Sequence, residues 1–528
     1  MKKKNIVFTA IAIVSIVLFI LAIVLNNGAS LTLGVIGATM LFVDGILTWI
    51  VPSKKATLFK IIILIALYMF ILSWIIPAGQ LSGSEIMDLG LRRVSLYAVL
   101  DYPYLTFMYF NQPFFFILAV GGLYGILTET GVYRKALERI AKSLKGKEKV
   151  FLFCTSFILA ALSSLFGLNI LLFIFIPALV AIILLMGYDK ITAFVTTFIA
   201  PLVGVIGSTY SNNVIGYIDQ IIGTGYTDVI VYKVALFVLS YVVFYFLLIR
   251  YADKNKNKAN ELTERAELTL IGGLTESKKS SWPIYLVFGI MLVILVLGYA
   301  QWENAFGVKW FTEAHKTVTE LEIGSEPIAS YLIGDLKAFG SWDYEQFTIL
   351  TVIASIVLAL VYNFKLDEAL KAYGKGVKRI LKGAVLFVIA YVLVITSAWH
   401  PIMVTVTDFL VGLVKGASGF LGSALFVLVS SIITIISTIL NIDMIYVLQS
   451  TSTVLLANYS SNAEALALLT QAVYGLTLFV APTSTLMILG LTYLDIPYKE
   501  WLKKSWKYLA FICAAILLVI IVFMIVMG

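Results

Sequence analysis

Apolar runs of eighteen or more residues recur along the whole chain, and they constrain its fold more than any other feature. Each run is long enough to cross a hydrocarbon core of roughly 30 Å as a helix. Inside that core the backbone N–H and C=O groups must be paired within the protein, which favours helices over open strands. The runs therefore predict an all-α polytopic membrane protein, with about eleven or twelve segments in one membrane domain.

Composition supports this interpretation and excludes most soluble classes of protein. Hydrophobic residues make up 61% of the 528 positions and charged residues only 13%, whereas a soluble domain carries about 25% charged residues. The net charge of +8 comes from basic residues that flank the apolar runs, as the positive-inside rule describes, so we expect lipid and not nucleic acid as a partner. Cys154 and Cys513 lie in apolar runs without metal-ligand spacing, and we expect buried thiols that only pack.

Charge asymmetry predicts the orientation. The run from Ile6 to Leu25 follows three lysines; it is longer than a usual signal-peptide core and lacks a small-residue cleavage site, which indicates a retained anchor. The basic pieces 133–149 and 365–382 then fall on the same side as the N-terminus, and the acidic segment 301–345 falls outside, where it is long enough to fold as a small cap. We expect a multi-pass protein of the inner or plasma membrane with a cytoplasmic N-terminus.

The two halves of the chain repeat one order of segments, which is a helix, an amphipathic arm, an interrupted apolar pair, an interrupted helix and a last helix. The arms lie on opposite sides of the membrane, so the pattern indicates an inverted repeat, each half with a re-entrant hairpin and a broken helix. The predicted regions are an extra N-terminal helical pair at 1–55, a first repeat at 56–250, a cytoplasmic linker at 251–282, connecting helices at 283–381 and a second repeat at 382–528.

Four polar breaks interrupt the apolar runs, at 163–169, 207–213, 440–443 and 475–485. Half-helix N-termini attract carboxylates, and exposed carbonyls coordinate Na⁺ or an ammonium group, so the breaks predict a substrate or ion site between the halves. The alternative is that each Ser or Thr only bonds its own backbone or a neighbouring helix. The candidate binding residues are Ser163, Ser164, Asn169, Ser208, Thr209, Ser211, Asn212, Asn213, Asn441, Asp443, Thr483 and Ser484.

Asp443 is the strongest single candidate for binding a substrate or an ion. An acid inside the apolar stretch 432–448 is costly in lipid, and it normally pairs with an ion, a proton or a charged ligand. The alternative is a shallow hairpin whose acid reaches water. We expect a structural or lumenal role for Asp44, a solvated Glu129, and packing in preference to proton sensing for His400.

The sequence carries no enzyme signature. It has no phosphate-binding Gly-x-x-x-x-Gly-Lys-Ser/Thr loop, no His-Glu-x-x-His and no adjacent Cys-His pair, so we expect neither an enzyme nor a cofactor. Driving energy for a transporter would then come from a Na⁺ or H⁺ gradient or from solute exchange. A channel and a membrane-embedded enzyme remain the alternatives from other classes; the first conducts without saturation, and the second needs titratable groups that converge at one depth.

Six short runs, in order, resemble the YfcC family of C4-dicarboxylate-carrier-like proteins within the ion transporter superfamily. They are Trp74-Ile75-Ile76-Pro77-Ala78-Gly79, Gly121-Gly122 with Thr130-Gly131, Gly187-Tyr188-Asp189, Ser208-Thr209, Pro482-Thr483-Ser484, and 494–501. The resemblance covers about residues 61–527. It implies an elevator-type carrier in which hairpins and broken helices move against a scaffold, commonly within a homodimer. Members of the family are described variously as basic amino-acid antiporters and dicarboxylate carriers.

The chain departs from the family pattern in four places. Residues 1–55 are an added helical pair, and Gly167-Leu168-Asn169-Ile170 stands where the family has an acidic pair. Val473-Tyr474-Gly475 replaces Gly-Asp-Gly, and Asn441-Ile442-Asp443-Met444 replaces a Ser-Gly-rich tip. We therefore predict a secondary active transporter of a small polar metabolite, first of all an amino acid of the arginine or ornithine type in exchange, with a di- or monocarboxylate carrier as the alternative.

Overall fold

The computed structural model describes residues 2–25, 28–53, 57–82, 85–256, 278–322, 326, 328–416, 418–459 and 462–527. Most of these residues are helical, because the long apolar runs pair their own backbone groups. Nine helices in the described residues are long and apolar enough to cross a membrane, and shorter apolar helices lie among them. The protein is therefore a multi-pass membrane protein, as the apolar runs predict.

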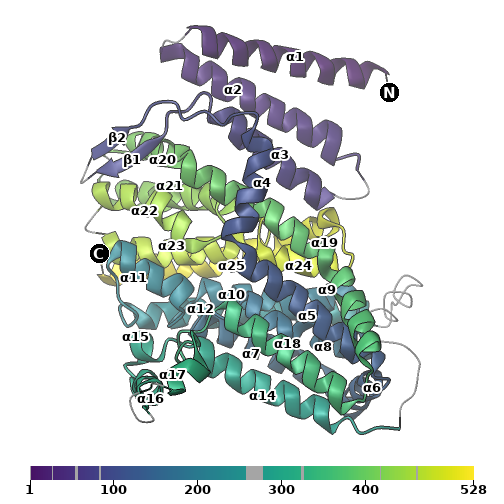
Figure 1. Ribbon diagram of the computed structural model, residues 1–528. Helices are drawn as coiled ribbons and strands as arrows, with labels where there is room; N and C mark the ends of the chain where they lie inside the picture. Colours follow the sequence, from purple (N-terminus) through teal and green to yellow (C-terminus); the bar gives the residue numbers. More distant parts are fainter. Residues whose placement is uncertain are drawn as a thin grey trace.

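The N-terminal part is a pair of helices at one edge of the molecule, shown in purple in Figure 1. The elements before the first break are α1 (Lys2–Leu25), α2 (Gly28–Gly45), a π-helical turn η1 (Ile46–Ile50), α3 (Thr57–Leu72), β1 (Gly79–Ser82), β2 (Glu85–Asp88), α4 (Ala98–Tyr109), α5 (Asn111–Glu129) and α6 (Tyr133–Ser143). The antiparallel pair β1–β2 places Gly79 opposite Asp88 and Ser82 opposite Glu85.

The first half contains two interrupted helical runs. Its elements are α7 (Glu148–Phe166), the 3₁₀ segment η2 (Ile170–Ile174), α8 (Ile176–Leu185), α9 (Lys190–Phe194), η3 (Val195–Ile199), α10 (Ala200–Ile206), η4 (Asn212–Gly216), α11 (Tyr217–Ile222) and α12 (Ile230–Asn255). η3 and η4 are π-helical, and η4 follows the break at 207–211.

The connecting region and the second half follow. Their elements are α14 (Trp282–Tyr299), α15 (Trp302–Phe306), α16 (Trp310–Thr319), α17 (Ile328–Ile333), α18 (Tyr344–Val361), α19 (Leu366–Trp399), α20 (Ile402–Gly412), α21 (Gly419–Leu440), α22 (Met444–Asn458), α23 (Ala463–Thr477), α24 (Thr485–Tyr493) and α25 (Tyr498–Met527). The segment 301–345 thus forms short helices that lie beside one another at one end of the molecule (Figure 1).

The two ends of the helical layer differ in charge. α6, the start of α19 and the N-terminus lie at one end in Figure 1, while β1, β2, α15–α17 and the C-terminus lie at the other. The first end carries the basic pieces 133–149 and 365–382, and the second carries the acidic segment 301–345. The separation agrees with the relative sidedness that the sequence predicts.

Glycines allow α5 and α19 to pack with their backbones in contact. A Cβ placed on Gly376 would lie 1.9 Å from the carbonyl oxygen of Gly121 and 2.6 Å from the amide nitrogen of Gly125. A Cβ on Gly125 would lie 2.2 Å from the carbonyl oxygen of Ala372. In lipid, the hydrophobic effect does not drive helices together. Small residues at a crossing let the two backbones approach closely, and the helices gain packing contacts.

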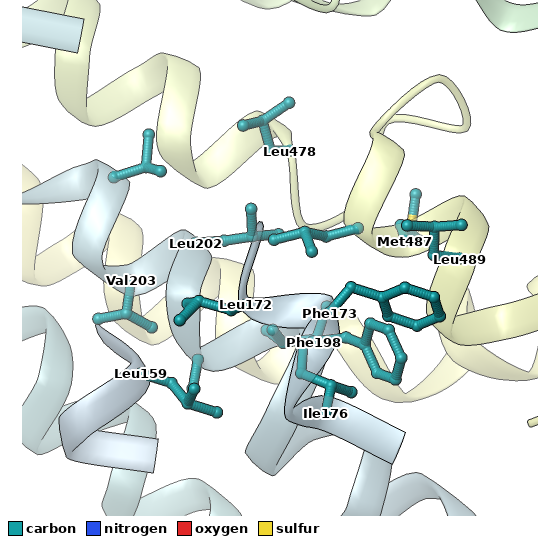
Figure 2. Packing of buried hydrophobic residues seen from close by; sticks show 14 of the residues in the cluster. Leu159, Leu172, Phe173, Ile176, Phe198, Leu202, Val203, Leu478, Met487 and Leu489 are labelled. Atoms are coloured by element: carbon teal, nitrogen blue, oxygen red, sulfur yellow. The ribbon is translucent and has the colours of Figure 1, made fainter. Parts of the chain in front are cut away.

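The core joins the two halves of the chain. Figure 2 shows Phe173 and Phe198 of the first half facing Met487 and Leu489 of α24. Phe173 is 1% exposed and Phe198 and Met487 are fully buried. The elements on both sides of each break are therefore held by dense apolar packing, which lets the breaks themselves stay polar.

Local structure adds detail to the all-helical fold. The short strands β1 and β2 follow Pro77, after α3 has ended at Leu72. The basic piece 365–382 forms one continuous helix with the residues that follow it in α19. Cys154 and Cys513 are exposed on the outer surface of the bundle instead of buried.

Candidate functional site

A cavity of about 380 Å³ lies where the breaks of both halves meet. Its wall includes Asn169 and Ile170 after α7, Asn213 in η4, the stretch 442–446 between α21 and α22, and 484–486 at the start of α24. The start of α5, with Gln112, closes another side. All four breaks thus contribute to the wall of one cavity.

The first wall is shaped by a left-handed turn at Gly167. This residue caps α7 with φ 75°, a conformation that favours glycine. A Cβ there would lie 2.2 Å from Asn213 Oδ1, so only glycine lets the turn approach η4. The Nδ2 of Asn213 donates to the carbonyl oxygen of Gly167 over 3.0 Å, which fixes the Asn213 side chain at the cavity.

Hydroxyl groups hold the end of α7 against the first break. The Ser164 hydroxyl donates to the carbonyl oxygen of Gly207 over 2.6 Å, and the backbone N–H of Thr209 donates to the carbonyl oxygen of Ser164 over 3.0 Å. The Ser163 hydroxyl donates to Asn169 Oδ1 over 2.5 Å and orients that amide at the cavity wall. These bonds satisfy backbone groups that the break leaves unpaired.

The second half supports the same break. Gln471 Nε2 of α23 donates to the carbonyl oxygens of Ile206 and Ser208, each over 3.1 Å. The Ser211 hydroxyl donates to the Ser208 hydroxyl over 3.3 Å. The bonds from Gln471 tie together two segments that are more than 250 residues apart in sequence, so the geometry of the break depends on both halves.

The second pair of breaks is built in a similar way. The Thr483 hydroxyl donates to the carbonyl oxygen of Ile439 over 3.0 Å, and the Tyr474 hydroxyl donates to the carbonyl oxygen of Ile442 over 2.7 Å. Asn441 is fully buried; its Nδ2 donates to the Ser437 hydroxyl, and its Oδ1 has no hydrogen-bond partner among the described residues. Side chains of one break again satisfy carbonyls of its neighbour.

Asp443 is the one acidic residue of the described chain that lines the cavity. Its Oδ1 accepts a hydrogen bond of 2.9 Å from the Tyr391 hydroxyl of α19. Among the described residues, no Lys, Arg or His side chain lines the cavity. A carboxylate with one neutral donor and no cationic neighbour is short of positive charge, and such a group in a membrane interior normally meets a cation.

The structure separates the twelve predicted residues into two groups. Asn169, Asn213, Asp443 and Ser484 line the cavity. The other eight lie behind the wall, where most of them pair with backbone or side-chain groups of the breaks; these are Ser163, Ser164, Ser208, Thr209, Ser211, Asn212, Asn441 and Thr483. In the same breaks, therefore, some polar residues line the cavity and others form hydrogen bonds within the protein.

Sequence reasoning missed the aromatic part of the wall. Seven tyrosines line the cavity, which are Tyr109, Tyr217, Tyr299, Tyr344, Tyr391, Tyr446 and Tyr474. They come from seven different helices, so no local pattern marks them. Their rings and hydroxyls give the cavity neutral donors and π-faces that attract cations.

Lys233 is a second residue that the sequence analysis missed. It lies in the apolar helix α12, its side chain is 1% exposed, and its Nζ donates to the carbonyl oxygens of Gly225 (3.0 Å) and Tyr226 (3.1 Å). The Tyr226 hydroxyl in turn donates to Asn212 Oδ1 over 3.2 Å. A lone lysine in the run 230–250 was the available signal, because ionisable residues in such runs are rare and functional.

Replacing Lys233 with Met should release the loop that carries Tyr226. Hydrogen bonds from a charged donor contribute about 1.5–3 kcal/mol, so the loop 223–229 should lose roughly that much protection. Hydrogen–deuterium exchange of the purified protein measures this directly. Lys254→Met, at an exposed position of the same helix, is the matched control and should leave the loop unchanged. Equal exchange in both variants would show that Lys233 does not anchor the loop.

The segment 301–345 contacts the first pair of breaks through aromatic rings. Phe306 of α15 lies 5.1 Å from Tyr210 and 6.1 Å from Phe166, measured between ring centroids. Tyr210 also stacks on Tyr226. This segment therefore covers one approach to the first pair of breaks, although no residue of α15–α17 lines the cavity.

The remaining titratable candidates lie away from the cavity. His400 Nε2 is 2.6 Å from the Tyr102 hydroxyl, and its Nδ1 contacts the carbonyl oxygen of Arg92, so it packs between segments as expected. Glu129 is exposed and pairs with Lys375 over 2.9 Å. The described residues contain no group of three or more His, Cys, Asp or Glu side chains arranged to hold a metal ion.

Three comparisons relate the chain to known proteins. A curated relative, an uncharacterized protein of Haemophilus influenzae, is 32% identical over 94 residues, and this match spans only 18% of each chain. The solved structure of MtrF from Neisseria gonorrhoeae, described as illuminating a class of antimetabolite efflux pumps, covers 88% of this chain and 94% of its own at 15% identity and a TM-score of 0.39. The family model of the C4-dicarboxylate anaerobic carriers (DcuC) matches residues 113–527. The match takes in α5 to α25 and every break around the cavity, and the chain belongs to the C4-dicarboxylate anaerobic carrier family.

Proposed function

We propose that this membrane transporter is a secondary carrier of a small solute with both a carboxylate and a protonated amine, an amino acid of the arginine or ornithine type. The observation that carries the proposal is the charge of the cavity wall, where Asp443 is the acidic residue and no basic side chain of the described chain is present. A dianion would meet a carboxylate there without a compensating cation, whereas an ammonium group would pair with it.

A helix end supplies the complementary partner for a carboxylate. α24 starts just after Ser484, and the Ser484 side chain does not bond the first turn of this helix. Its N-terminus reaches the cavity wall. The positive dipole end of α24 favours a carboxylate group, and Asp443 favours an amine, so the wall offers one place for each charge of an amino acid.

The size and the aromatic lining of the cavity fit the same solute. Binding cavities for small molecules measure about 300–1,000 Å³, and this one measures about 380 Å³. The rings of Tyr217, Tyr446 and Tyr474 add faces that attract a guanidinium or ammonium group.

We further propose that transport follows an elevator mechanism in a cell-membrane homodimer with a cytoplasmic N-terminus. In this scheme the two halves are inverted repeats, and the paired breaks move together against a scaffold that includes α5, α18 and α19. The bonds of Gln471 and Thr483 support such a unit, because they tie the breaks to one another. Na⁺, H⁺ or a counter-solute would supply the energy, and the unpaired Asn441 Oδ1 is a candidate ligand for a coupling ion.

The family match favours a second candidate, a di- or monocarboxylate carrier. In that case Asp443 would bind a proton together with the solute, and the hydroxyls and helix N-termini would hold the anion. The two candidates differ in the charge that the solute brings to Asp443.

Binding to the purified protein separates the two candidates. We expect arginine and ornithine, but not succinate, to raise the thermal unfolding temperature, with about 2.7 kcal/mol of stabilisation at 100 times the dissociation constant. Asp443→Asn should remove the shift. Stabilisation by succinate, absent with every amino acid, would reject the amino-acid proposal and favour the carboxylate carrier.

A further inference from the structure

A second cavity, of about 890 Å³, lies apart from the candidate substrate site. Its walls are the start of α3, the middle of α19 and the turn between α24 and α25. It lies toward the basic end of the bundle, where α3 and α25 begin (Figure 1). None of its lining residues belongs to the first cavity, so it is a separate site.

The wall formed by α19 changes from basic to apolar along the helix. Lys378 and Lys382 are exposed and stand one turn apart, and Leu381, Val385 and Ile389 continue into the cavity. Leu381 and Val385 remain 40% and 44% exposed in the isolated chain. From Lys378 to Ile389 the helix rises about 16 Å, which is about the depth of one leaflet of the hydrocarbon core.

The charges of the wall are not neutralised within the described chain. Asp495, in a left-handed turn with φ 51°, is the acidic residue of the lining, and neither lysine forms an ion pair with it within 4.0 Å. Two lysines and one aspartate give the wall a net charge of +1, which complements a single phosphodiester. Basic sites between membrane helices are a recurrent way to bind anionic headgroups.

We propose that this cavity binds a singly anionic phospholipid of the phosphatidylglycerol type. Its phosphate lies between Lys378 and Lys382, its headgroup hydroxyls donate to Asp495, and an acyl chain runs along Leu381, Val385 and Ile389. The lysines stand just before the apolar part of α19, where the end of a membrane-spanning stretch would meet lipid phosphates. The bound lipid contacts α19 on one side and α24 on the other.

Native mass spectrometry of the full-length protein in detergent tests this proposal. With phosphatidylglycerol added we expect one retained lipid, and with phosphatidylcholine or inorganic phosphate alone we expect none at equal concentration. Lys378→Gln with Lys382→Gln should weaken phosphatidylglycerol binding about 30-fold, since a basic residue near an anionic headgroup contributes roughly fivefold. Lys371→Gln with Lys503→Gln removes the same charge from exposed positions outside the cavity and should bind as the wild type does.

A variant that fills the cavity distinguishes lipid binding at this site from attraction of lipid to surface charge in general. Val385→Trp keeps both lysines and occupies the apolar part of the wall, so it should also lose the retained lipid. Retention by Val385→Trp, equal weakening in both lysine pairs, or equal retention of phosphatidylcholine would each overturn the proposal. Binding of inorganic phosphate with the same lysine dependence would reject a lipid site in favour of a free anion site.

Discussion

Asp443→Asn lowers the kcat/KM of solute uptake at least about 100-fold, because loss of one partner of a buried ion pair costs roughly 3–5 kcal/mol. Asn has nearly the same shape as Asp, and its amide oxygen still accepts the hydrogen bond that Tyr391 donates to Asp443. The fold should therefore survive while the charge that meets the solute is lost. Uptake of labelled solute into proteoliposomes, at matched amounts of folded protein, measures the effect.

Asp408→Asn provides the control for charge removal. Asp408 is exposed on α20 and does not line the cavity, so its variant should transport as the wild type does. If Asp443→Asn also transported normally, the carboxylate would have no part in solute binding and the proposed ion pair would be wrong.

The largest effect on stability is expected at Gly376, where α5 and α19 touch. A Cβ at this position would lie 1.9 Å from the carbonyl oxygen of Gly121, so Gly376→Ala forces two backbones apart. Overpacking costs about 1–3 kcal/mol, and we expect the upper end because backbone atoms cannot turn away as a side chain does. Thermal unfolding of the purified protein in detergent should show a clear fall in the midpoint and in the yield of folded material.

Gly374→Ala is a matched control on the same helix. Gly374 is exposed, and a Cβ there meets nothing within 4 Å, so the variant should be as stable as the wild type or more stable by about 0.5–1 kcal/mol. Similar midpoints for the two variants would mean that the close crossing of α5 and α19 is not required for stability.

Much of the fold was predictable, because apolar runs and the polar breaks between them determine helices and interruptions from the local sequence alone. The apolar runs predict the helices, and the polar breaks at 163–169, 207–213 and 440–443 coincide with interruptions in the structure. Helix ends were less predictable. α19 continues through 365–382, since amphipathic sequence outside the membrane extends a helix as readily as it forms a separate one. The strands β1 and β2 carry no strong alternation, and their pairing depends on contacts with α20 and with each other.

The site was predictable only where polar residues interrupt an apolar run. That signal found Asn169, Asn213, Asp443 and Ser484 at the cavity. It did not separate them from Ser164 or Thr483, because a residue in a break either faces the cavity or bonds a neighbouring carbonyl, and sequence does not reveal its direction. The lining tyrosines come together only through tertiary packing, so no segment of sequence marks them.

Counterflow in proteoliposomes tests the central claim most directly. Vesicles are loaded with unlabelled arginine or ornithine, and entry of labelled arginine is followed with wild-type protein and with Asp443→Asn. The account predicts saturable exchange that depends on the internal solute and is lost in the variant. Exchange of labelled succinate without any exchange of amino acids in the same vesicles, or flux that does not saturate, would contradict it.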